Sequence, residues 1–333
     1  MSNKSSNSMI FINKKELKLI REENNDIYLS KIIKVDGFKK LIVSWNVVTP
    51  SYSYIAVQAK VYVQNKKDKK KRWSEWISWG KWGTNIKRGS ESSKYDELKI
   101  DVDTLSINEG YRGKAIQLRI VSYYENIDDV ADVKEISITY YKENNDGLNN
   151  KEYELINKLI ETPCISQMKR DEKIAHKICS PTSLTMLLNR LGENLKVEDV
   201  AYSCFDYNYN EFGNWTYNVA YAGSLGYKAY IEYGGINSLI REISNGNPVE
   251  VSVKYTNDIN KKEYPYIENA PLTTNGHLIV VCGIEVNKDG KWIVVNDPAG
   301  KDDKSVRLKY KLEEFMKAWQ RSNYIMYVIH KQN

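Results

Sequence analysis

A cysteine separates a polar loop from an amphipathic segment within residues 176–192. Leucines recur at helical spacing in that segment and predict a helix with one apolar face: Leu184, Leu187, Leu188 and Leu191. Gly192 follows them and predicts the C-terminal end of the helix. Cys179 would then lie at the helix N-terminus, with Ser180 or Thr182 as the cap, where the helix dipole favours a thiolate. Cys179 is therefore either an activated nucleophile or a small buried side chain that packs like an apolar residue.

A cysteine nucleophile needs a base, and the base needs a partner that orients it. The chain has three histidines, of which His277 stands directly before the apolar run 278–281. The next predicted strand, residues 292–296, is followed by Asp297. Because a hairpin places the start of one antiparallel strand beside the end of the next, we expect His277 and Asp297 at the same sheet edge. Taken singly, a histidine bonded to backbone and an Asp-Pro turn are both common.

The composition predicts an ordinary globular protein of about two domains. Of the 333 residues 41% are hydrophobic and 28% charged, and the net charge of +6 indicates a lysine-rich surface rather than a nucleic-acid partner. The four cysteines form no CxxC pair, so we expect neither a metal nor a cofactor. No apolar run is long enough to span a membrane, and the N-terminus lacks the apolar core of a signal peptide. A cytoplasmic location is therefore expected, with export by a route that has no readable signal as the alternative.

Strand patterns dominate the first half of the chain and predict an all-β sandwich there. The runs are residues 41–47, 54–63, 115–123 and 133–140. Four parts are therefore expected along the chain: an N-terminal arm at 1–30, a β-sandwich accessory domain at 31–143, an Asn/Gly-rich linker at 144–152, and a second domain at 153–333.

Two features of the predicted sandwich have alternative interpretations. Trp73, Trp76, Trp79 and Trp82 could form an aromatic platform that contacts carbohydrate or peptide. Strand tryptophans more often fill a core and its edge, so the structural interpretation is favoured. The basic run 66–72 is interpreted mainly as a solvated turn, with a contact to phosphate or an anionic cell-wall polymer as the alternative.

The second domain is predicted to place helices before an antiparallel sheet, which is an α+β layout. Residues 153–160 are expected to form a connecting helix, and helical or mixed structure is expected from the Cys179 segment to about residue 226. The strand runs are residues 249–253, 278–283, 292–296 and 324–329.

The order of cysteine, histidine and aspartate in this domain is the papain-like one. The domain resembles the peptidase C39-like family, relatives of the peptidases that process double-glycine bacteriocin leaders. The resemblance covers about residues 160–330 and rests on the segments 165–167, 179–188, 213–215, 246–249, 276–281 and 296–298, with Phe315 and Trp319 after them. It implies a papain-like α+β cysteine peptidase fold.

The resemblance also implies roles for individual residues. Cys179 would be the nucleophile, His277 the base, Asp297 the orienting residue and Gln167 a donor to the oxyanion. Ser180 stands where the family often has glycine, and the stretch between Gln167 and Cys179 is long and rich in charges, which departs from the family pattern.

Three hypotheses follow for the function. The favoured one is a cysteine peptidase that hydrolyses a peptide or protein substrate through a thioester, with the β-domain binding substrate or a partner. The second is an amidase or transpeptidase on the same triad, and the third is a non-catalytic binding protein that uses the tryptophan-rich face. Ser180, Asn214 and Trp215 are expected to line the substrate groove, although a tryptophan that only packs at a helix start fits Trp215 equally well.

Overall fold

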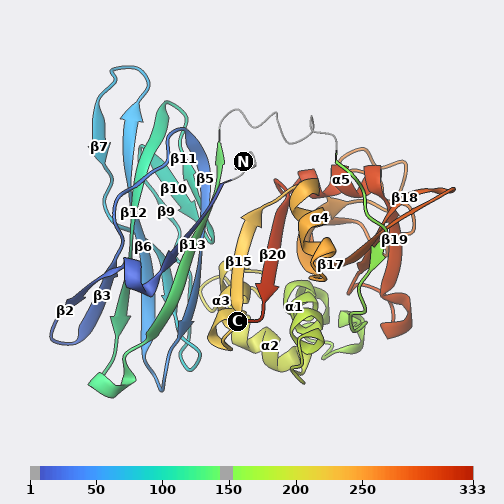
Figure 1. Ribbon diagram of the computed structural model, residues 1–333, viewed down its shortest axis with the longest axis horizontal. Helices are drawn as coiled ribbons and strands as arrows, with labels where there is room; N and C mark the ends of the chain where they lie inside the picture. The colour runs from blue at the N-terminus through green and yellow to red at the C-terminus, as the bar shows by residue number, and fades with distance from the viewer. Residues whose placement is uncertain (1–7, 143–152, 333) are drawn as a thin grey trace. The chain divides into compact units, whose positions relative to one another are not determined.

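The computed structural model describes residues 8–142 and 153–332, which form two compact units (Figure 1). The first unit contains Met1–Leu148 together with Phe205–Ile231, and the second contains Asn149–Cys204 together with Glu232–Asn333. The segment Phe205–Ile231 thus packs with the first unit although it comes from within the second half of the chain. The expected linker, residues 144–152, lies outside the described residues.

The first unit is built mainly from two antiparallel sheets. One sheet has the strand order β1-β13-β5-β11-β10-β9. Its strands are β1 (Ser8–Asn13), β13 (Asp132–Lys142), β5 (Phe38–Val48), β11 (Thr104–Ile107), β10 (Leu98–Asp101) and β9 (Ser93–Lys94). The other has the order β2-β3-β12-β6-β7, with β4 beside β12 and β8 beside β6. Its strands are β2 (Lys18–Arg21), β3 (Asn25–Leu29), β12 (Tyr111–Tyr123), β6 (Tyr54–Asn65), β7 (Lys71–Trp73), β4 (Ile33–Lys34) and β8 (Ile77–Trp82).

Alternating side chains explain why these strands form a core. Along β6, the side chains on one face are fully buried: Ile55, Val57, Ala59, Val61 and Val63. Strand β5 contacts β12 and β11 contacts β12, so the two sheets touch. The predicted strands of this half are confirmed, and residues 8–29, expected as a terminal arm, supply β1, β2 and β3 to the two sheets.

The four clustered tryptophans divide into two pairs. Trp79 and Trp82 are buried in the core. Trp73 and Trp76 are half-buried, and the Lys60 ammonium lies 5.1 Å from the centre of each of their rings. The four indoles therefore do not form one exposed platform, because two of them fill the interior, as is usual for strand aromatics.

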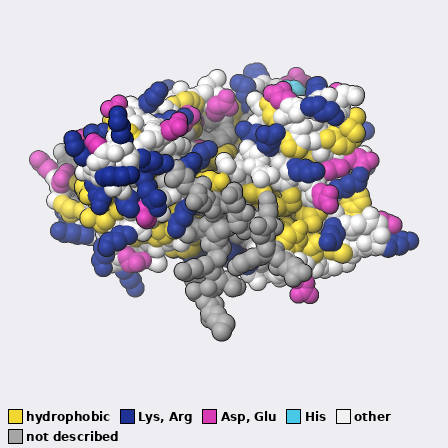
Figure 2. Space-filling view, turned by 90° about the horizontal axis from the view of Figure 1, so that it is seen from above, with side chains coloured by type: hydrophobic (Ala, Val, Ile, Leu, Met, Phe, Trp, Pro, Cys, Tyr) yellow, Lys and Arg dark blue, Asp and Glu magenta, His cyan; other side chains and the backbone are white. Residues whose placement is uncertain are grey.

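The basic run 66–72 is exposed at the turn between β6 and β7, and this exposure fits the solvated-turn interpretation. On the face of the molecule drawn in Figure 2, lysine and arginine side chains are interspersed with acidic ones. Such mixing is typical of a solvated surface.

Helix α3 (Trp215–Ser224) and the beginning of β15 (Lys228–Tyr233) belong to the first unit, where α3 contacts β5. The backbone N–H of Ala229 donates to Asn46 Oδ1 at 3.0 Å, and that of Ile231 donates to Ser44 Oγ at 3.0 Å. Polar side chains of β5 therefore satisfy the backbone of a segment that is distant in sequence.

The second unit contains an antiparallel sheet in which β20, β16, β17, β18 and β19 follow one another, with β14 beside β17. Its strands are β20 (Ile325–His330), β16 (Val249–Tyr255), β17 (Thr274–Asn287), β18 (Gly290–Asn296), β19 (Arg307–Lys311) and β14 (Lys158–Leu159). Its helices are α1 (Cys179–Arg190), α2 (Val197–Cys204), α4 (Ile236–Ser244) and α5 (Leu312–Gln320). Helix α1 contacts β16 and β17, so it lies against the middle of the sheet (Figure 1). The N-terminal sheet domain and the C-terminal α+β region agree with the predicted layout.

One predicted element of this unit is wrong. Residues 153–160 do not form a helix; instead Lys158–Leu159 is a short strand that pairs with β17. Gly283 permits this pairing, because a Cβ atom there would lie 2.5 Å from the Lys158 carbonyl oxygen. In the described part of the chain, α1 is the longest helix at 12 residues, and no helix there has the length and apolar character needed to cross a membrane.

Candidate active site

Cys179 is the first residue of α1, and its side chain is partly exposed. The predicted helix is confirmed, but the predicted cap is wrong, because Ser180 and Thr182 lie inside the helix and Ile178 precedes it without a side-chain cap. The Ile178 side chain therefore does not compete for the backbone N–H groups of the first turn. The backbone N–H groups of Ser180 in α1 and of Leu278 in β17 lower the pKa of the Cys179 thiol.

His277 is buried in β17. Its Nε2 lies 2.7 Å from Asp297 Oδ1, and Asp297 and Cys179 both raise the pKa of its ring. Since Nε2 is occupied by the carboxylate, Nδ1 is the nitrogen left for the sulfur. The strand begins at Thr274, three residues before His277.

Asp297 directly follows β18 and has no exposed surface. Its Oδ1 accepts from His277 and from the backbone N–H of Ala299 at 3.0 Å. Its Oδ2 accepts from the hydroxyls of Tyr255 and Tyr310, both at 2.8 Å. Four donors therefore hold this buried carboxylate, which explains how a charge is accommodated there.

The three ionisable side chains shift one another's pKa values. For Asp297, burial raises the pKa, but the charge and hydrogen bond of His277 and the two tyrosine hydroxyls outweigh it, so the net pKa is lowered. Burial lowers the pKa of His277, but Asp297 and Cys179 raise it to about 10. Burial raises the pKa of the Cys179 thiol, and His277 with two backbone N–H groups reverses this, so the net pKa is lowered. The arrangement favours a thiolate beside an imidazolium.

Gln167 is buried and lies close to the segment that carries Asp297. Its backbone N–H donates to the carbonyl of Pro298 at 2.8 Å. Its side-chain Nε2 donates to the carbonyl of Ala175 at 2.6 Å, and its Oε1 has no hydrogen-bond partner among the described residues. One N–H of the amide is thus left for another acceptor.

The side chain of Ser180, expected to line a substrate groove, is not accessible to a substrate. Its side chain is fully buried, and its Oγ donates to Glu250 Oε1 at 2.9 Å and lies 3.2 Å from the Tyr327 hydroxyl. Any contact of Ser180 with a substrate would therefore come from its backbone.

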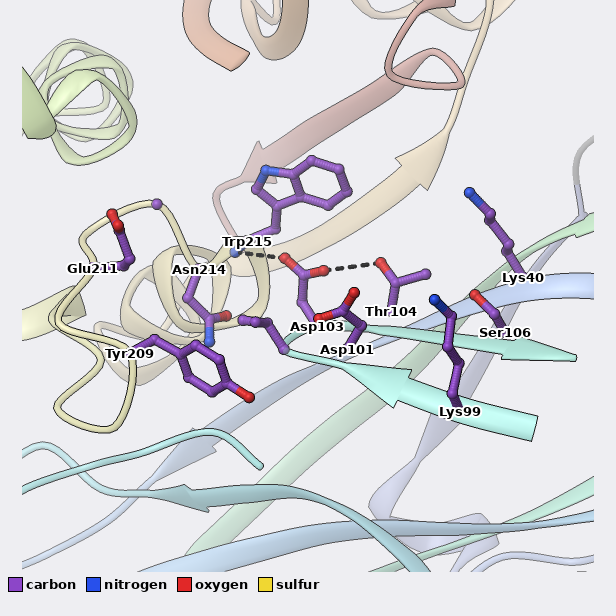
Figure 3. A pocket seen from close by; sticks show the side chains of 12 residues that line it. Lys40, Lys99, Asp101, Asp103, Thr104, Ser106, Tyr209, Glu211, Asn214 and Trp215 are labelled. Atoms are coloured by element: carbon purple, nitrogen blue, oxygen red, sulfur yellow. Dashed lines mark hydrogen bonds between the residues drawn. The ribbon is translucent and has the colours of Figure 1, made fainter. Parts of the chain in front are cut away.

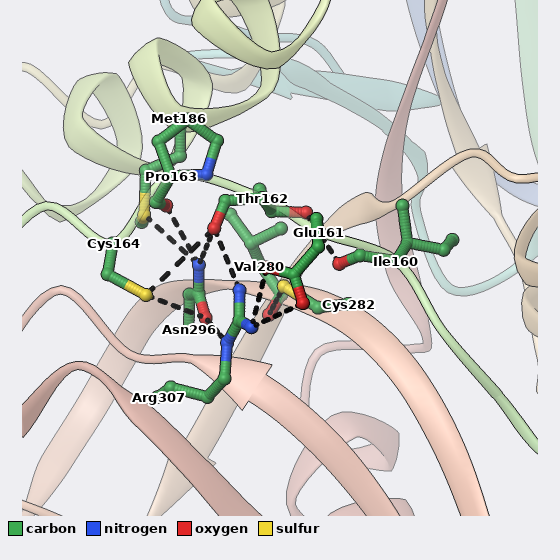
Figure 4. Close-up of polar contacts among 10 residues, drawn as sticks. All are labelled: Ile160, Glu161, Thr162, Pro163, Cys164, Met186, Val280, Cys282, Asn296 and Arg307. Carbon is green, nitrogen blue, oxygen red and sulfur yellow. Dashed lines mark hydrogen bonds and ion pairs between the residues drawn. The ribbon is translucent and has the colours of Figure 1, made fainter.

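A polar cluster anchors the end of β18, directly before Asp297 (Figure 4). Asn296 Nδ2 donates to the carbonyl of Pro163 at 2.8 Å, and its Oδ1 accepts from Arg307 Nε at 3.1 Å. Arg307 Nη2 also donates to the carbonyl of Thr162 at 2.8 Å. The extended segment before Gln167 is thereby tied to β18 and β19.

Sequence reasoning missed three side chains of this site: Tyr255, Tyr310 and Glu250. The two tyrosines lie on β16 and β19 and carried no signal, because one tyrosine among 25 is not distinctive. Glu250 did carry a signal, since it interrupts the otherwise apolar start of the run 249–253.

Asn214 and Trp215 belong to the first unit, where they stand at the start of α3 (Figure 3). Asn214 is buried and caps this helix, because its Oδ1 accepts the backbone N–H of Tyr217 at 3.2 Å. The backbone N–H of Trp215 donates to Asp103 Oδ2 at 3.2 Å. Burial raises the pKa of Asp103 to about 6, against the hydrogen bonds that lower it.

Trp215 also lines a cavity of about 680 Å³ within the first unit. Side chains of both charges face it in Figure 3, with Lys40 and Lys99 at one side and Asp101, Asp103 and Glu211 elsewhere around it. The cavity therefore has charges of both signs and an aromatic ring in its wall.

Two protein-family models match two separate regions of the chain. A model of the Peptidase_C39 like family matches residues 159–327, and a model of the Peptidase C39 N-terminal domain matches residues 27–138. No curated protein matches the chain. Among solved structures, that of infectious bursal disease virus Gx strain is 9% identical, with 41% of this chain and 33% of that chain covered and a TM-score of 0.20. The Gt strain is also 9% identical, with 45% and 46% covered and a TM-score of 0.13.

Proposed function

Because the chain belongs to the peptidase C39-like family, we propose that it is a cysteine peptidase with a papain-like catalytic domain and a triad of Cys179, His277 and Asp297. The observation that carries this proposal is the position of His277, whose Nε2 lies 2.7 Å from Asp297 Oδ1 and whose pKa is raised by both Asp297 and Cys179. The two sheets of the first unit would form a β-sandwich accessory domain.

The proposed reaction begins with the thiolate. Cys179 Sγ attacks the carbonyl carbon of a peptide bond and forms a tetrahedral oxyanion. The protonated His277 donates its proton to the leaving amine, and collapse of the intermediate gives a thioester. Asp297 keeps the imidazole oriented and stabilises its charge.

Hydrolysis of the thioester completes the cycle. His277 takes a proton from water, whose oxygen attacks the thioester carbonyl, and the second tetrahedral intermediate expels the Cys179 thiolate. The free N–H of the Gln167 side chain and the Cys179 backbone N–H would donate to the oxyanion in both steps. Burial of Gln167 near the loop after Asp297 supports this role.

A peptide library followed by mass spectrometry tests the proposal. The wild-type chain should create new peptide termini, Cys179→Ala should create none, and His277→Ala should be slower by about 10³-fold or more. Identical products from wild type and Cys179→Ala would contradict a peptidase at this site.

The same triad would also serve an amidase or a transpeptidase. Reaction in ¹⁸O-labelled water with an added amine separates hydrolysis from acyl transfer. A peptidase or an amidase places one labelled oxygen in the new carboxyl group, whereas a transpeptidase joins the acyl group to the added amine.

The cavity of the first unit favours a second function, binding of a peptide. Its two lysines and its acidic side chains offer partners for charges of both signs, and Trp215 offers an apolar wall. In the inactive Cys179→Ala chain, Trp215→Ala should weaken binding of the identified peptide substrate by about tenfold, whereas Trp76→Ala should leave it unchanged. If Trp215→Ala bound the peptide as tightly as the Cys179→Ala parent does, the cavity would not be the peptide-binding site.

A further inference from the structure

Glu250 is a carboxyl group with no exposed surface in the middle of the second unit's sheet. It lies on β16, opposite Val280 of β17 and Tyr327 of β20. An isolated ionised carboxylate is costly at such a position, so the group is expected to be neutral or to have a strong partner.

The contacts of Glu250 lead to the nucleophile. Its Oε1 accepts from Ser180 Oγ at 2.9 Å, and Ser180 is the residue after Cys179 in the first turn of α1. Its Oε2 has no hydrogen-bond partner among the described residues. Among the described residues, no lysine or arginine forms an ion pair with this carboxyl, and His277 is a cation that lowers its pKa.

Ionisable groups face Glu250 from three elements: Cys179 on α1, His277 on β17 and Tyr327 on β20. Burial raises the pKa of Glu250 well above its ordinary value, and the charge of Cys179 adds to this, whereas the Ser180 hydrogen bond and His277 act in the opposite direction. A negative Glu250 would compete with the Cys179 thiolate for the single positive charge of His277.

We propose that Glu250 is a positioning residue of the active site, which carries a proton while Cys179 and His277 are ionised and holds the nucleophile in place through Ser180. This inference rests on the proposed cysteine peptidase. A neutral carboxyl in this position anchors the first turn of α1 without adding a charge that would disfavour the thiolate.

Alkylation of Cys179 by iodoacetamide tests the proposal on the full chain, with the rate followed from pH 5 to 10 by mass spectrometry of the Cys179 peptide. Glu250→Gln is the matched variant, because its amide is neutral and its oxygen still accepts from Ser180. The alkylation rate of Glu250→Gln should have the same midpoint pH as that of the wild type. Glu250→Ala and Ser180→Ala both break the link, and each should raise the midpoint and slow alkylation at pH 7 by about fivefold or more.

The outcomes are distinguishable. A midpoint in Glu250→Gln that falls by more than about half a unit would mean that wild-type Glu250 is ionised, and the proposal would be overturned. An unchanged profile in Ser180→Ala, or in a folded Glu250→Ala, would overturn the positioning role. A different comparison tests the proposed function. If iodoacetamide alkylates Cys179 no faster in the wild type than in His277→Ala, the proposed function fails, whatever the result for Glu250.

Discussion

His277 Nε2 and Asp297 Oδ1 are 2.7 Å apart, and both side chains are buried. The two residues lie on neighbouring strands, because Val280 of β17 pairs with Asn296 of β18. His277 stands three residues before Val280, and Asp297 stands one residue after Asn296. The carboxylate is held by four donors, so it can fix the imidazole without rearranging.

The coupled pKa values predict a wide pH range of activity. The lowered pKa of Cys179 and the raised pKa of His277, about 10, mean that thiolate and imidazolium coexist between the two values. The rate of peptide hydrolysis should therefore rise with pH as Cys179 ionises, stay level, and fall as the pH passes about 10. Steady-state kcat/KM measured across pH checks this, and an alkaline limb near 7 would contradict the ion pair.

Asp297→Asn should remove the group that raises the pKa of His277. The imidazole would then lose its proton at lower pH, and its orientation would no longer be fixed, so kcat should fall by about 10²–10⁴-fold. The alkaline limb should move to lower pH at the same time. A profile that keeps its limb near pH 10 in this variant would show that another group holds the histidine proton.

The two tyrosines that donate to Asp297 should both contribute to the stability of the protein. Tyr255→Phe and Tyr310→Phe each remove one hydrogen bond to a buried carboxylate, which should cost about 1–3 kcal/mol of unfolding free energy. Because both bonds end on the same oxygen, the double variant should depart from additivity. Urea unfolding of the wild type, both single variants and the double variant measures the coupling, and strict additivity would count against a shared network.

Glu250 should make the stability of the protein decrease as pH rises. Its pKa is raised on folding, so the folded state binds more protons than the unfolded state once the pH exceeds the unfolded value of about 4.3. The stabilising effect of that proton is complete below this value and is lost as the pH rises toward the folded pKa. Urea unfolding at pH 5 and pH 8 should therefore show a smaller loss of stability in Glu250→Gln than in wild type, and parallel losses would contradict a neutral Glu250.

The two tryptophan pairs of the first unit should differ in their effect on stability. Trp82→Ala leaves a cavity in the core and should cost about 3–5 kcal/mol. Trp76→Ala, at a half-buried position under Arg119, is the matched control and should cost about 1 kcal/mol. Chemical denaturation of both variants measures the difference, and equal losses would indicate that Trp76 also supports the core.

Local patterns predicted much of the fold. The alternation in residues 54–63 predicted a strand with one buried face, and the leucine spacing after Cys179 predicted α1. The connecting helix expected at 153–160 is wrong, because pairing with β17 beside Gly283 depends on a partner more than 100 residues away. The cap of α1 is wrong for the same kind of reason, since Ser180 bonds to Glu250 on another element.

By itself, the sequence determined the main strands of both units, helix α1 and the approach of His277 to Asp297, because periodicity and hairpin geometry are local properties of the chain. Only the tertiary structure decided that Phe205–Ile231 packs with the first unit, that Tyr255 and Tyr310 donate to Asp297, and that Glu250 accepts from Ser180. These contacts join residues that are far apart in sequence. Each depends on how strands are ordered and faces are paired, and no short stretch of sequence contains that information.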